Sequence, residues 1–373
     1  MTFKNVYEKI LANKANLESG KPNCIPFPFR RFRQYLPGIM KGIPYLITAS
    51  SGIGKSQITK YLFLMNTYKF LKEHPESGIK VKIIWFALEE SKEMFILSLI
   101  SNQLKEKFGI AMPAIELLSY KDDPLSEDVA LKIKDCEKDV EEILSIVDVV
   151  DTISNPTGMY KYVRDNHLMK TGTVSKKTIQ VYSEGTLKSE QIPDKYIPDD
   201  ENLWYIVVTD HIGLIEGEKG AEKTHEAMTL WSAKYTRKML CKFFGCSVAN
   251  IQQQAADTEK VQFTRDGLSI EQKLEPSLSG LADNKLTQRD HMVVIGLFAP
   301  VRYEIPAHKQ YNIGILKDNY RSLSILKTNI GETNIKVGLF FDGASNTFSE
   351  LPHPIDERDK LEKIYDNLRL KKP

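Results

Sequence analysis

Eight residues in the first sixth of the chain have the types and spacing of a loop that binds phosphate. Residues 49–56 read ASSGIGKS and lie between an apolar run and a run that favours a helix. In such a loop, backbone N–H groups point inward at phosphate oxygens, and Gly52 and Gly54 adopt conformations that side chains forbid. Lys55 would reach the β- and γ-phosphates, and Ser56 would hold Mg²⁺. The residues expected to bind the nucleotide are Ser51, Gly52, Ile53, Gly54, Lys55, Ser56 and Gln57.

The same stretch has a second interpretation. Ala49 stands where the pattern usually has its first glycine, which makes the pattern less specific. A glycine-rich turn between a strand and a helix would look much the same. The strand before the loop and the helix after it are what phosphate binding requires, so we expect an ATP·Mg²⁺ site.

Acidic residues follow two other apolar runs and could complete such a site. LWYIVVTD closes on Asp210, which would orient the Mg²⁺ water shell, or would simply cap the next element. VKIIWFALEES ends with Glu89 and Glu90. A carboxylate at the tip of a strand beside the phosphate loop could polarise an attacking water. The alternative is a solvated acidic loop that caps the next helix.

Strands and helices alternate around these motifs, which predicts an α/β protein. The expected strands are 45–49, 81–88, 203–210, 246–253, 291–298 and 311–318, and the expected helices are 55–74, 91–109, 126–147 and 225–245. The strands are nearly all apolar and β-branched, which favours a mainly parallel sheet covered by helices on both faces.

Three segments fall outside that alternation. Residues 1–40 form an N-terminal helix and an extended lead-in, ahead of a core expected over residues 41–350. Polar residues 171–202 interrupt the core and predict an inserted hairpin or loop. Residues 351–373 form a charged tail, expected to be a solvated helix.

The composition is that of an ordinary globular protein, with 42% hydrophobic and 27% charged residues. The longest apolar run falls short of the ~18 residues that a membrane span needs, and the N-terminus has no apolar signal core, so we expect a cytoplasmic protein. The four cysteines are scattered and predict reduced thiols. A net charge of +2 means that any nucleic-acid contact must come from a local basic surface or a ring of subunits.

The order of these motifs resembles the RecA-like ATPase domain of DnaB-type replicative helicases, superfamily 4. FALEES resembles the family's strand-end motif with the catalytic glutamate, which implies Glu89. VVTDHIGLI resembles its metal-side motif at Asp210, and VANIQQQ resembles its strand that ends in the γ-phosphate sensor, which implies Gln253. The resemblance covers about residues 25–350. Asp283 takes an arginine-like position of the family pattern, and the primase-binding N-terminal domain is not expected here.

In that family a last strand carries a Lys-x-Arg pair that reaches the neighbouring subunit's ATP. ILKDNYRS matches at Lys317, but Asn319 holds the arginine position and Arg321 lies two residues later. The resemblance implies that Lys317 and Arg321 act in trans. If Arg321 cannot reach, Arg302 or another cation must serve; Arg321 could also be a surface residue in a turn.

The resemblance also implies a homo-oligomer, usually a hexamer, with single-stranded DNA in the pore and with primase or a loader among the possible partners. The DNA loops would be residues 216–225 and 256–273, in which Lys219, Lys223, Lys260 and Arg265 could meet phosphates, although both loops could be solvated instead. In the lead-in, Phe27, Phe29, Phe32 and Tyr35 could dock on the next subunit, stack on bases, or pack on the chain's own sheet.

Three functions remain open from the sequence. The first is an ATP-driven DNA helicase or translocase. The second is a RecA-like switch, loader or recombination ATPase that does not unwind DNA. The third is an oligomer that binds nucleotide only as a structural ligand.

Overall fold

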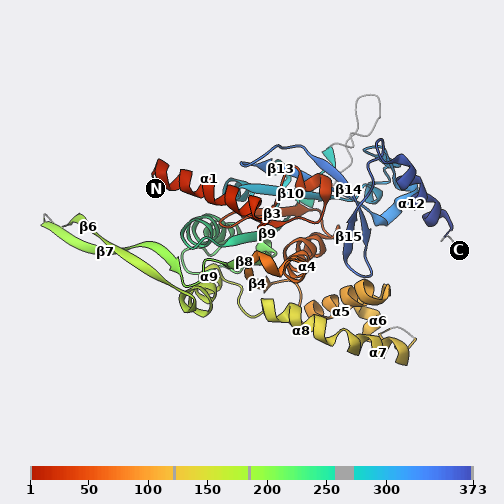
Figure 1. Ribbon diagram of the computed structural model, residues 1–373, viewed down its shortest axis with the longest axis horizontal. Helices are drawn as coiled ribbons and strands as arrows, with labels where there is room; N and C mark the ends of the chain where they lie inside the picture. The colour runs from red at the N-terminus through yellow and green to blue at the C-terminus, as the bar shows by residue number, and fades with distance from the viewer. Residues whose placement is uncertain (1, 121–122, 184–185, 257–272, 371–373) are drawn as a thin grey trace.

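The computed structural model describes residues 2–120, 123–183, 186–256 and 273–370 (Figure 1). Its centre is a nine-stranded sheet in the order β15-β14-β13-β10-β3-β9-β8-β4-β5. The six strands from β10 to β5 are parallel, and the three others are antiparallel. The prediction of an α/β fold with a mainly parallel sheet is confirmed.

The parallel half of the sheet is buried on both faces. Its strands are β3 (Pro44–Ala49), β4 (Lys80–Ala87), β5 (Val147–Val150), β8 (Leu203–Asp210), β9 (Ser247–Gln253) and β10 (Val293–Phe298). One face packs on the helices that follow the phosphate loop, and the other packs on the helices around Trp231. Alternate residues of each strand enter one core or the other, as the β pleat requires.

The helices that cover these faces follow the four predicted ranges closely but are more broken, and α6 and α9 were not predicted. The first is a continuous run of α3 (Lys55–Lys60), the π-helical η1 (Tyr61–Met65) and α4 (Asn66–Glu73). The others are α5 (Lys92–Phe108), α6 (Ala114–Leu117), α7 (Glu127–Asp135), α8 (Glu137–Ile146), α9 (Pro156–Asn166), α10 (Thr224–Thr229) and the π-helical η5 (Leu230–Phe243).

The single helix expected over residues 126–147 is wrong in two respects. Cys136 divides it into α7 and α8, and the buried thiol side of Cys136 packs with Leu104, Leu117 and Val140. Its last residues belong to β5, which pairs in parallel with β4. A short apolar run of this kind does not distinguish a helix end from an edge strand.

The antiparallel half was largely missed. The strand expected over residues 311–318 is instead β12 (Tyr311–Asn312), the short helix α11 (Ile313–Leu316) and the turn η11 (Lys317–Asn319). Asn312 caps the helix by accepting a hydrogen bond from Ile315 N–H at 3.1 Å. The strand proper starts at Tyr320, and the three antiparallel strands are β13 (Tyr320–Thr328), β14 (Lys336–Asp342) and β15 (Thr347–Glu350). The two-residue β11 (Ala307–His308) pairs with β12.

The N-terminal region has two parts. α1 (Phe3–Glu18) projects from the body and has no buried residue, although Phe3, Ile10 and Leu17 are apolar. The lead-in folds into β1 (Ile25–Pro26), α2 (Arg30–Arg33) and β2 (Gly38–Ile39). Phe27, Phe29 and Phe32 are at most 1% exposed and pack in the chain's own core. Of the three interpretations of this run, the structure therefore favours packing on the chain's own sheet.

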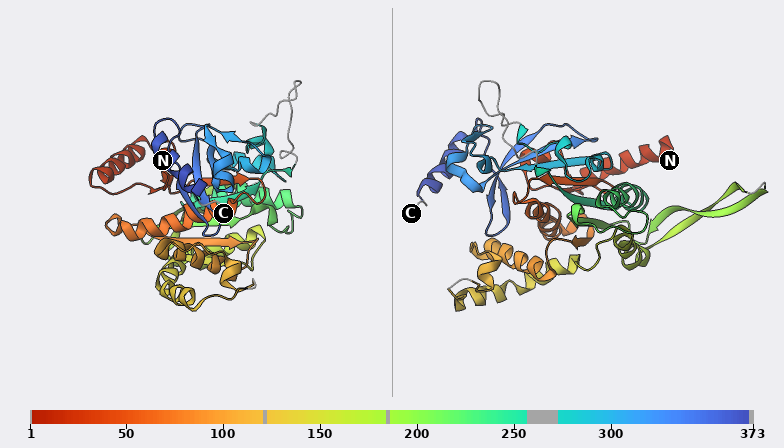
Figure 2. Two further views of the ribbon diagram at one scale, coloured as in Figure 1. Left: turned by 90° about the vertical axis from the view of Figure 1, so that its right-hand side faces the viewer. Right: turned by 180° about the vertical axis from the view of Figure 1, so that it is seen from behind.

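The polar insertion over residues 171–202 is a hairpin, which is one of the two forms predicted for it. β6 (Gly172–Ser183) and β7 (Thr186–Pro198) pair along their length and extend far from the body (Figures 1 and 2). Near its base, Val174 and Tyr196 pack against the main core, and Tyr196 stacks edge-on with Phe244. Because the hairpin directly precedes β8, it leaves the sheet at the amino ends of the parallel strands. The phosphate loop lies at their carboxyl ends.

The C-terminal tail is a helix, α12 (Arg358–Leu370), but it is not fully solvated. Leu361 and Tyr365 are buried against Tyr311, Leu316 and Tyr320. The four cysteines are unpaired. Within the described ranges, the helices are all too short or too polar to cross a membrane.

Candidate nucleotide site

The phosphate loop connects β3 to α3 at the carboxyl edge of the parallel strands. Gly52 and Gly54 have φ of 70° and 106°, a region that favours glycine. Lys55, the first residue of α3, is only 8% exposed, and its Nζ donates to the carbonyl oxygen of Ser50 at 3.2 Å. The loop therefore curls around the side chain of Lys55, and α3 begins at the end of the loop.

Ser56 and Asp210 meet at the metal side of this loop. The Ser56 hydroxyl donates to Asp210 Oδ1 at 2.9 Å, and Asp210 is 1% exposed at the end of β8. Burial raises the pKa of Asp210 to about 7; the Ser56 hydrogen bond opposes the rise, and the nearby charges of Glu90 and Glu89 add to it. A hydroxyl and a carboxylate oxygen are hard ligands of the kind that suits Mg²⁺ beside phosphate.

Glu89 and Glu90 follow β4 and differ in their surroundings. Glu90 pairs with Lys60 Nζ at 2.9 Å, and Lys60 also donates to Ser98 Oγ at 2.7 Å, so Lys60 joins α3 both to Glu90 and to α5. Glu89 is exposed. The expectation that their strand is next to that of the phosphate loop is wrong, because β9 and β8 lie between β3 and β4. Glu89 nevertheless lies close enough to Asp210 to raise its pKa.

His211 is a residue of this region that the sequence reasoning did not single out. Burial lowers the pKa of its imidazole, and the charges of Glu89, Lys55 and Asp283 act on it as well. Its Nδ1 accepts a hydrogen bond from Gly213 N–H at 3.2 Å. The signal was its position directly after Asp210. Asp283, at φ 60°, has its carboxylate beside Gly213.

Three successive glutamines lie at the end of β9 and directly after it, and their side chains have different surroundings. Gln252 is fully buried and donates to the carbonyls of Ala282 at 2.6 Å and Asn284 at 2.9 Å. Gln254 donates to Thr48 Oγ1 at 2.9 Å. Gln253, between them, is half-buried and points to the opposite face, the one that carries α3. The structure thus places the predicted sensor on the side of the phosphate loop.

Arg321 does not extend outward toward a neighbouring subunit. Its side chain is 3% exposed, and its Nε donates to the carbonyl oxygen of Ile53 at 2.8 Å, inside the chain's own phosphate loop. This position is at odds with the expected role in trans. Lys317 is exposed in the turn before β13. Arg302, in the short helix η10 (Pro300–Tyr303), is exposed and donates to the Ser51 carbonyl.

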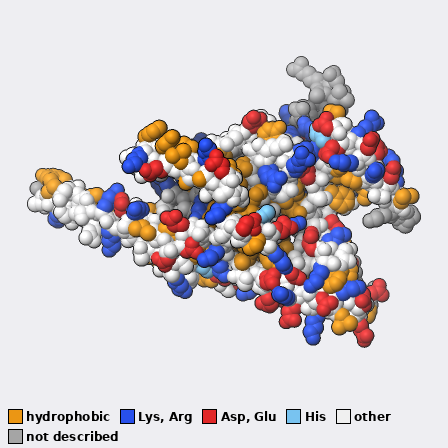
Figure 3. Space-filling model, viewed as in Figure 1, with side chains coloured by type: hydrophobic (Ala, Val, Ile, Leu, Met, Phe, Trp, Pro, Cys, Tyr) orange, Lys and Arg blue, Asp and Glu red, His pale blue; other side chains and the backbone are white. Residues whose placement is uncertain are grey.

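The predicted DNA loops are only partly described. Lys219 and Lys223 are exposed in the segment after β8, where Glu218 fixes the N-terminus of α9 by accepting from Thr157 N–H at 3.0 Å. Lys260 and Arg265 lie outside the described residues. On the face shown in Figure 3, blue and red side chains are interspersed, without a continuous basic patch.

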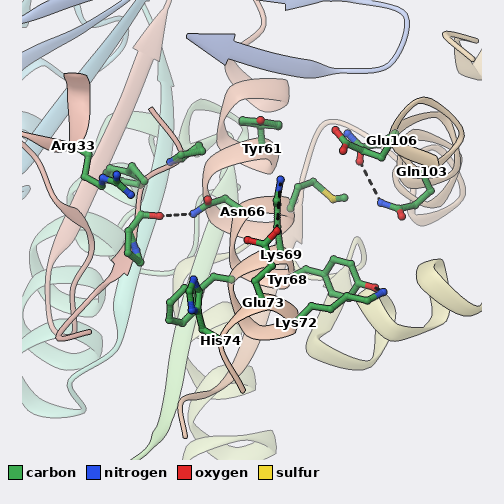
Figure 4. A pocket seen from close by; sticks show the side chains of 16 residues that line it. Arg33, Tyr61, Asn66, Tyr68, Lys69, Lys72, Glu73, His74, Gln103 and Glu106 are labelled. Atoms are coloured by element: carbon green, nitrogen blue, oxygen red, sulfur yellow. Dashed lines mark hydrogen bonds and ion pairs between the residues drawn. The ribbon is translucent and has the colours of Figure 1, made fainter. Parts of the chain in front are cut away.

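A well-formed pocket lies away from the phosphate loop. It has a volume of about 460 Å³ and lies between the lead-in, the α4 run and α5, with Arg33, Tyr61, Lys69 and Glu106 among its lining residues (Figure 4). None of the predicted site residues lines it. The site described above is therefore defined by side-chain chemistry at the carboxyl ends of the parallel strands and not by this pocket.

Solved structures resemble this chain over nearly its whole length. One of them, an ATPase domain, has a TM-score of 0.62 at 17% identity, covering 93% of this chain and 98% of that one. A DnaB-like replicative helicase, described with its interactions with primase, has a TM-score of 0.61 at 18% identity, covering 93% of this chain and 67% of that one. The fold is that of a RecA-like ATPase domain. No family model and no curated protein matches the sequence.

Proposed function

We propose that the protein is an ATP-dependent DNA helicase or translocase of DnaB-like type, which forms a ring and hydrolyses ATP between subunits. The observation that carries the proposal is the contact of Ser56 with Asp210 at the head of α3, because it joins the phosphate loop to a buried acid from another strand. The order of Glu89, Asp210 and Gln253 along the chain supports the helicase-like type.

The residues divide the work of hydrolysis. The loop from Ser51 to Gln57 binds the phosphates of ATP, and Lys55 neutralises their charge. Ser56 and Asp210 would hold Mg²⁺, which when bound neutralises charge on the transferred phosphoryl group. Glu89 takes a proton from the attacking water or orients it. Gln253 reports the γ-phosphate to the segment that follows β9, and Lys317 acts on the ATP of the neighbouring subunit.

The ring proposal has two supporting features. Lys317 is exposed and not committed to its own chain's phosphate loop. α1 presents apolar side chains with exposed fractions of 84% at Phe3, 58% at Ile10 and 65% at Leu17, which fits an arm that docks on a second copy. Single-stranded DNA would pass the loops after β8 and β9, and primase, a loader or another replication protein would be a further partner.

The experiment that tests this function is steady-state ATP hydrolysis with and without single-stranded DNA, together with the mass in solution. A hexamer-sized species whose turnover rises with DNA supports the translocase. A protein that neither binds nor hydrolyses ATP would exclude it. In the same assay, Glu89→Gln should abolish turnover; little change would point to a nucleotide bound only as a structural ligand.

The arm has its own test. Ile10→Glu places a charge in the apolar stripe of α1 and should shift the mass toward the monomer. Ala15→Glu adds the same charge on the opposite side of the helix and is the matched control. Both residues are exposed in the single chain, so neither change should alter its fold. An unchanged mass for Ile10→Glu would mean that α1 does not hold the ring.

A second candidate is a RecA-like switch or loader ATPase without unwinding activity. The burial of Arg321 favours this candidate, because, of the two cations predicted to act in trans, it leaves Lys317 alone in an exposed position. A lysine lacks the bidentate hydrogen-bonding geometry of arginine. Such a protein should hydrolyse ATP slowly, ignore single-stranded DNA and respond to a protein partner instead.

A further inference from the structure

We infer that Arg321 is a positioning residue for the phosphate loop of its own subunit. The inference rests on the proposed nucleotide site and assigns to Arg321 a task that differs from a finger in trans. The guanidinium comes from the antiparallel strand β13 and reaches the loop between β3 and α3.

The donors of Arg321 are committed within the chain. Nε donates to the Ile53 carbonyl at 2.8 Å, Nη1 donates to the carbonyls of Asp318 at 2.7 Å and Tyr320 at 2.9 Å, and Nη2 pairs with the Asp318 carboxylate at 3.1 Å. The guanidinium carbon lies 4.6 Å from the centre of the Phe341 ring. Moving this side chain toward a second subunit would break these contacts together and leave buried carbonyls unpaired.

The contact with Ile53 determines how one peptide unit of the loop is oriented. In a planar trans peptide the carbonyl and the next N–H point in opposite directions. Because Arg321 holds the Ile53 carbonyl, the Gly54 N–H must point away from Arg321. Gly54, at φ 106°, relies on this restraint more than a residue with a side chain would. Phe341 packs close to the same part of the loop, because a Cβ added to Gly54 would lie 3.9 Å from its ring.

Arg302 provides a comparison on the other side of the loop. It donates to the Ser51 carbonyl from an exposed position, and its neighbour Tyr303 has its hydroxyl 3.4 Å from Ser50 Oγ. An exposed hydrogen bond of this kind competes with water and holds its partner less firmly than a buried one. Arg321 is therefore expected to matter more for the loop than Arg302.

The first test is the affinity of dilute protein for a fluorescent ATP analogue. Arg321→Ala should weaken binding at least about tenfold, Arg302→Ala should weaken it less, and the exposed Arg358→Ala serves as a matched control. Equal affinity of Arg321→Ala and the wild type would overturn the inference while leaving the nucleotide site intact. A wild type that binds no analogue would overturn the proposed function itself.

Arg321→Lys covers the case in which the alanine variant does not fold. It keeps the positive charge but cannot make the forked contacts, so affinity should still fall. Affinity equal to that of the wild type would show that charge alone suffices and would contradict the positioning role.

A second test separates action in cis from action in trans. Lys55→Ala and Arg321→Ala subunits, co-expressed with different tags and purified as mixed oligomers, are assayed for ATP hydrolysis. A trans finger would restore turnover, because the Arg321→Ala subunit supplies an intact loop and the Lys55→Ala subunit supplies the finger. If Arg321 is a positioning residue in cis, turnover of the mixed oligomer should not exceed that of the Arg321→Ala protein alone, because both loops are defective. Restored turnover would overturn the inference.

Discussion

The parallel and antiparallel halves of the one sheet contribute to the candidate nucleotide site in different ways. The groups with proposed chemical tasks, Lys55, Ser56 and Asp210, lie near the carboxyl ends of the parallel strands. The antiparallel half contributes side chains that contact the loop's backbone, above all Arg321 on the Ile53 carbonyl. In the function proposed above, the parallel half carries the reaction, and the antiparallel half holds the backbone that the reaction needs.

The difference shows why a single motif does not make a site. The phosphate loop has two positive-φ glycines, and such backbone is costly to order. Its conformation depends on contacts from strands that lie much later in the chain, such as the Ile53 to Arg321 contact with a sequence separation of 268. Substitutions in the two halves should therefore fail in different ways.

The largest effect is expected for Lys55→Ala in the parallel half. Removing the buried ammonium beside the phosphates should reduce ATP hydrolysis at least about 100-fold, because nothing else in the loop carries a positive charge. Hydrolysis measured with folded protein checks this, and Lys69→Ala, an exposed lysine farther along the same helical run, is the control. Unchanged turnover in Lys55→Ala would contradict the nucleotide site.

Asp210→Asn should separate function from stability. Hydrolysis should be lost with the metal-side carboxylate, yet the metal-free protein should become more stable. The folded pKa of Asp210, about 7, lies above its ordinary value of 3.8. The folded chain thus binds more protons, and stability falls as pH rises between these two values.

The measurement is urea unfolding without Mg²⁺ over a range of pH. The advantage of Asp210→Asn over the wild type should grow by up to about 1.4 kcal/mol per pH unit from about pH 4 to about pH 7 and then level off. Asp366→Asn, at a largely exposed position on α12, is measured beside it as the control substitution. A constant difference across pH would mean that Asp210 titrates normally.

The smallest pair of effects contrasts two neighbouring glutamines. Gln252→Ala should destabilise the fold by about 2 kcal/mol, because it leaves the buried carbonyls of Ala282 and Asn284 without donors. Gln253→Ala should change stability by less than about 0.5 kcal/mol but should reduce the response of hydrolysis to single-stranded DNA. The reverse pattern would show that β9 presents the other glutamine to the nucleotide.

Much of the parallel half could be predicted because its signals are local. Continuous β-branched runs mark strands that are buried on both faces, and each chemical residue follows one of them directly. Asp210 was predicted in this way, whereas Gln253 was implied by the family resemblance of VANIQQQ, and the roles of both residues stay predictions. The order of the strands in the sheet depends on contacts between segments far apart in the sequence. The prediction that β4 lies next to β3 was therefore wrong.

The antiparallel half could not be read in the same manner. The residues 311–318 are apolar enough for a strand, yet the side-chain cap at Asn312 and the turn at Lys317, with φ 48°, make a helix and a corner there. The position of Arg321 depends on the pairing of β13 with β10 and β14, which joins segments far apart in the sequence. The sequence around an arginine near a turn does not show whether its side chain points into solvent or into the protein.

The β6–β7 hairpin has a consequence for how the molecule can vary. Ser175 and Lys195 face each other across its two strands, just outside Val174 and Tyr196, which belong to the core. Paired residues in adjacent strands lie about 5 Å apart, a gap that a two-residue turn closes. We therefore expect that the part of the hairpin beyond that pair can be exchanged, lengthened or lost as one unit, while the RecA-like body keeps its sequence.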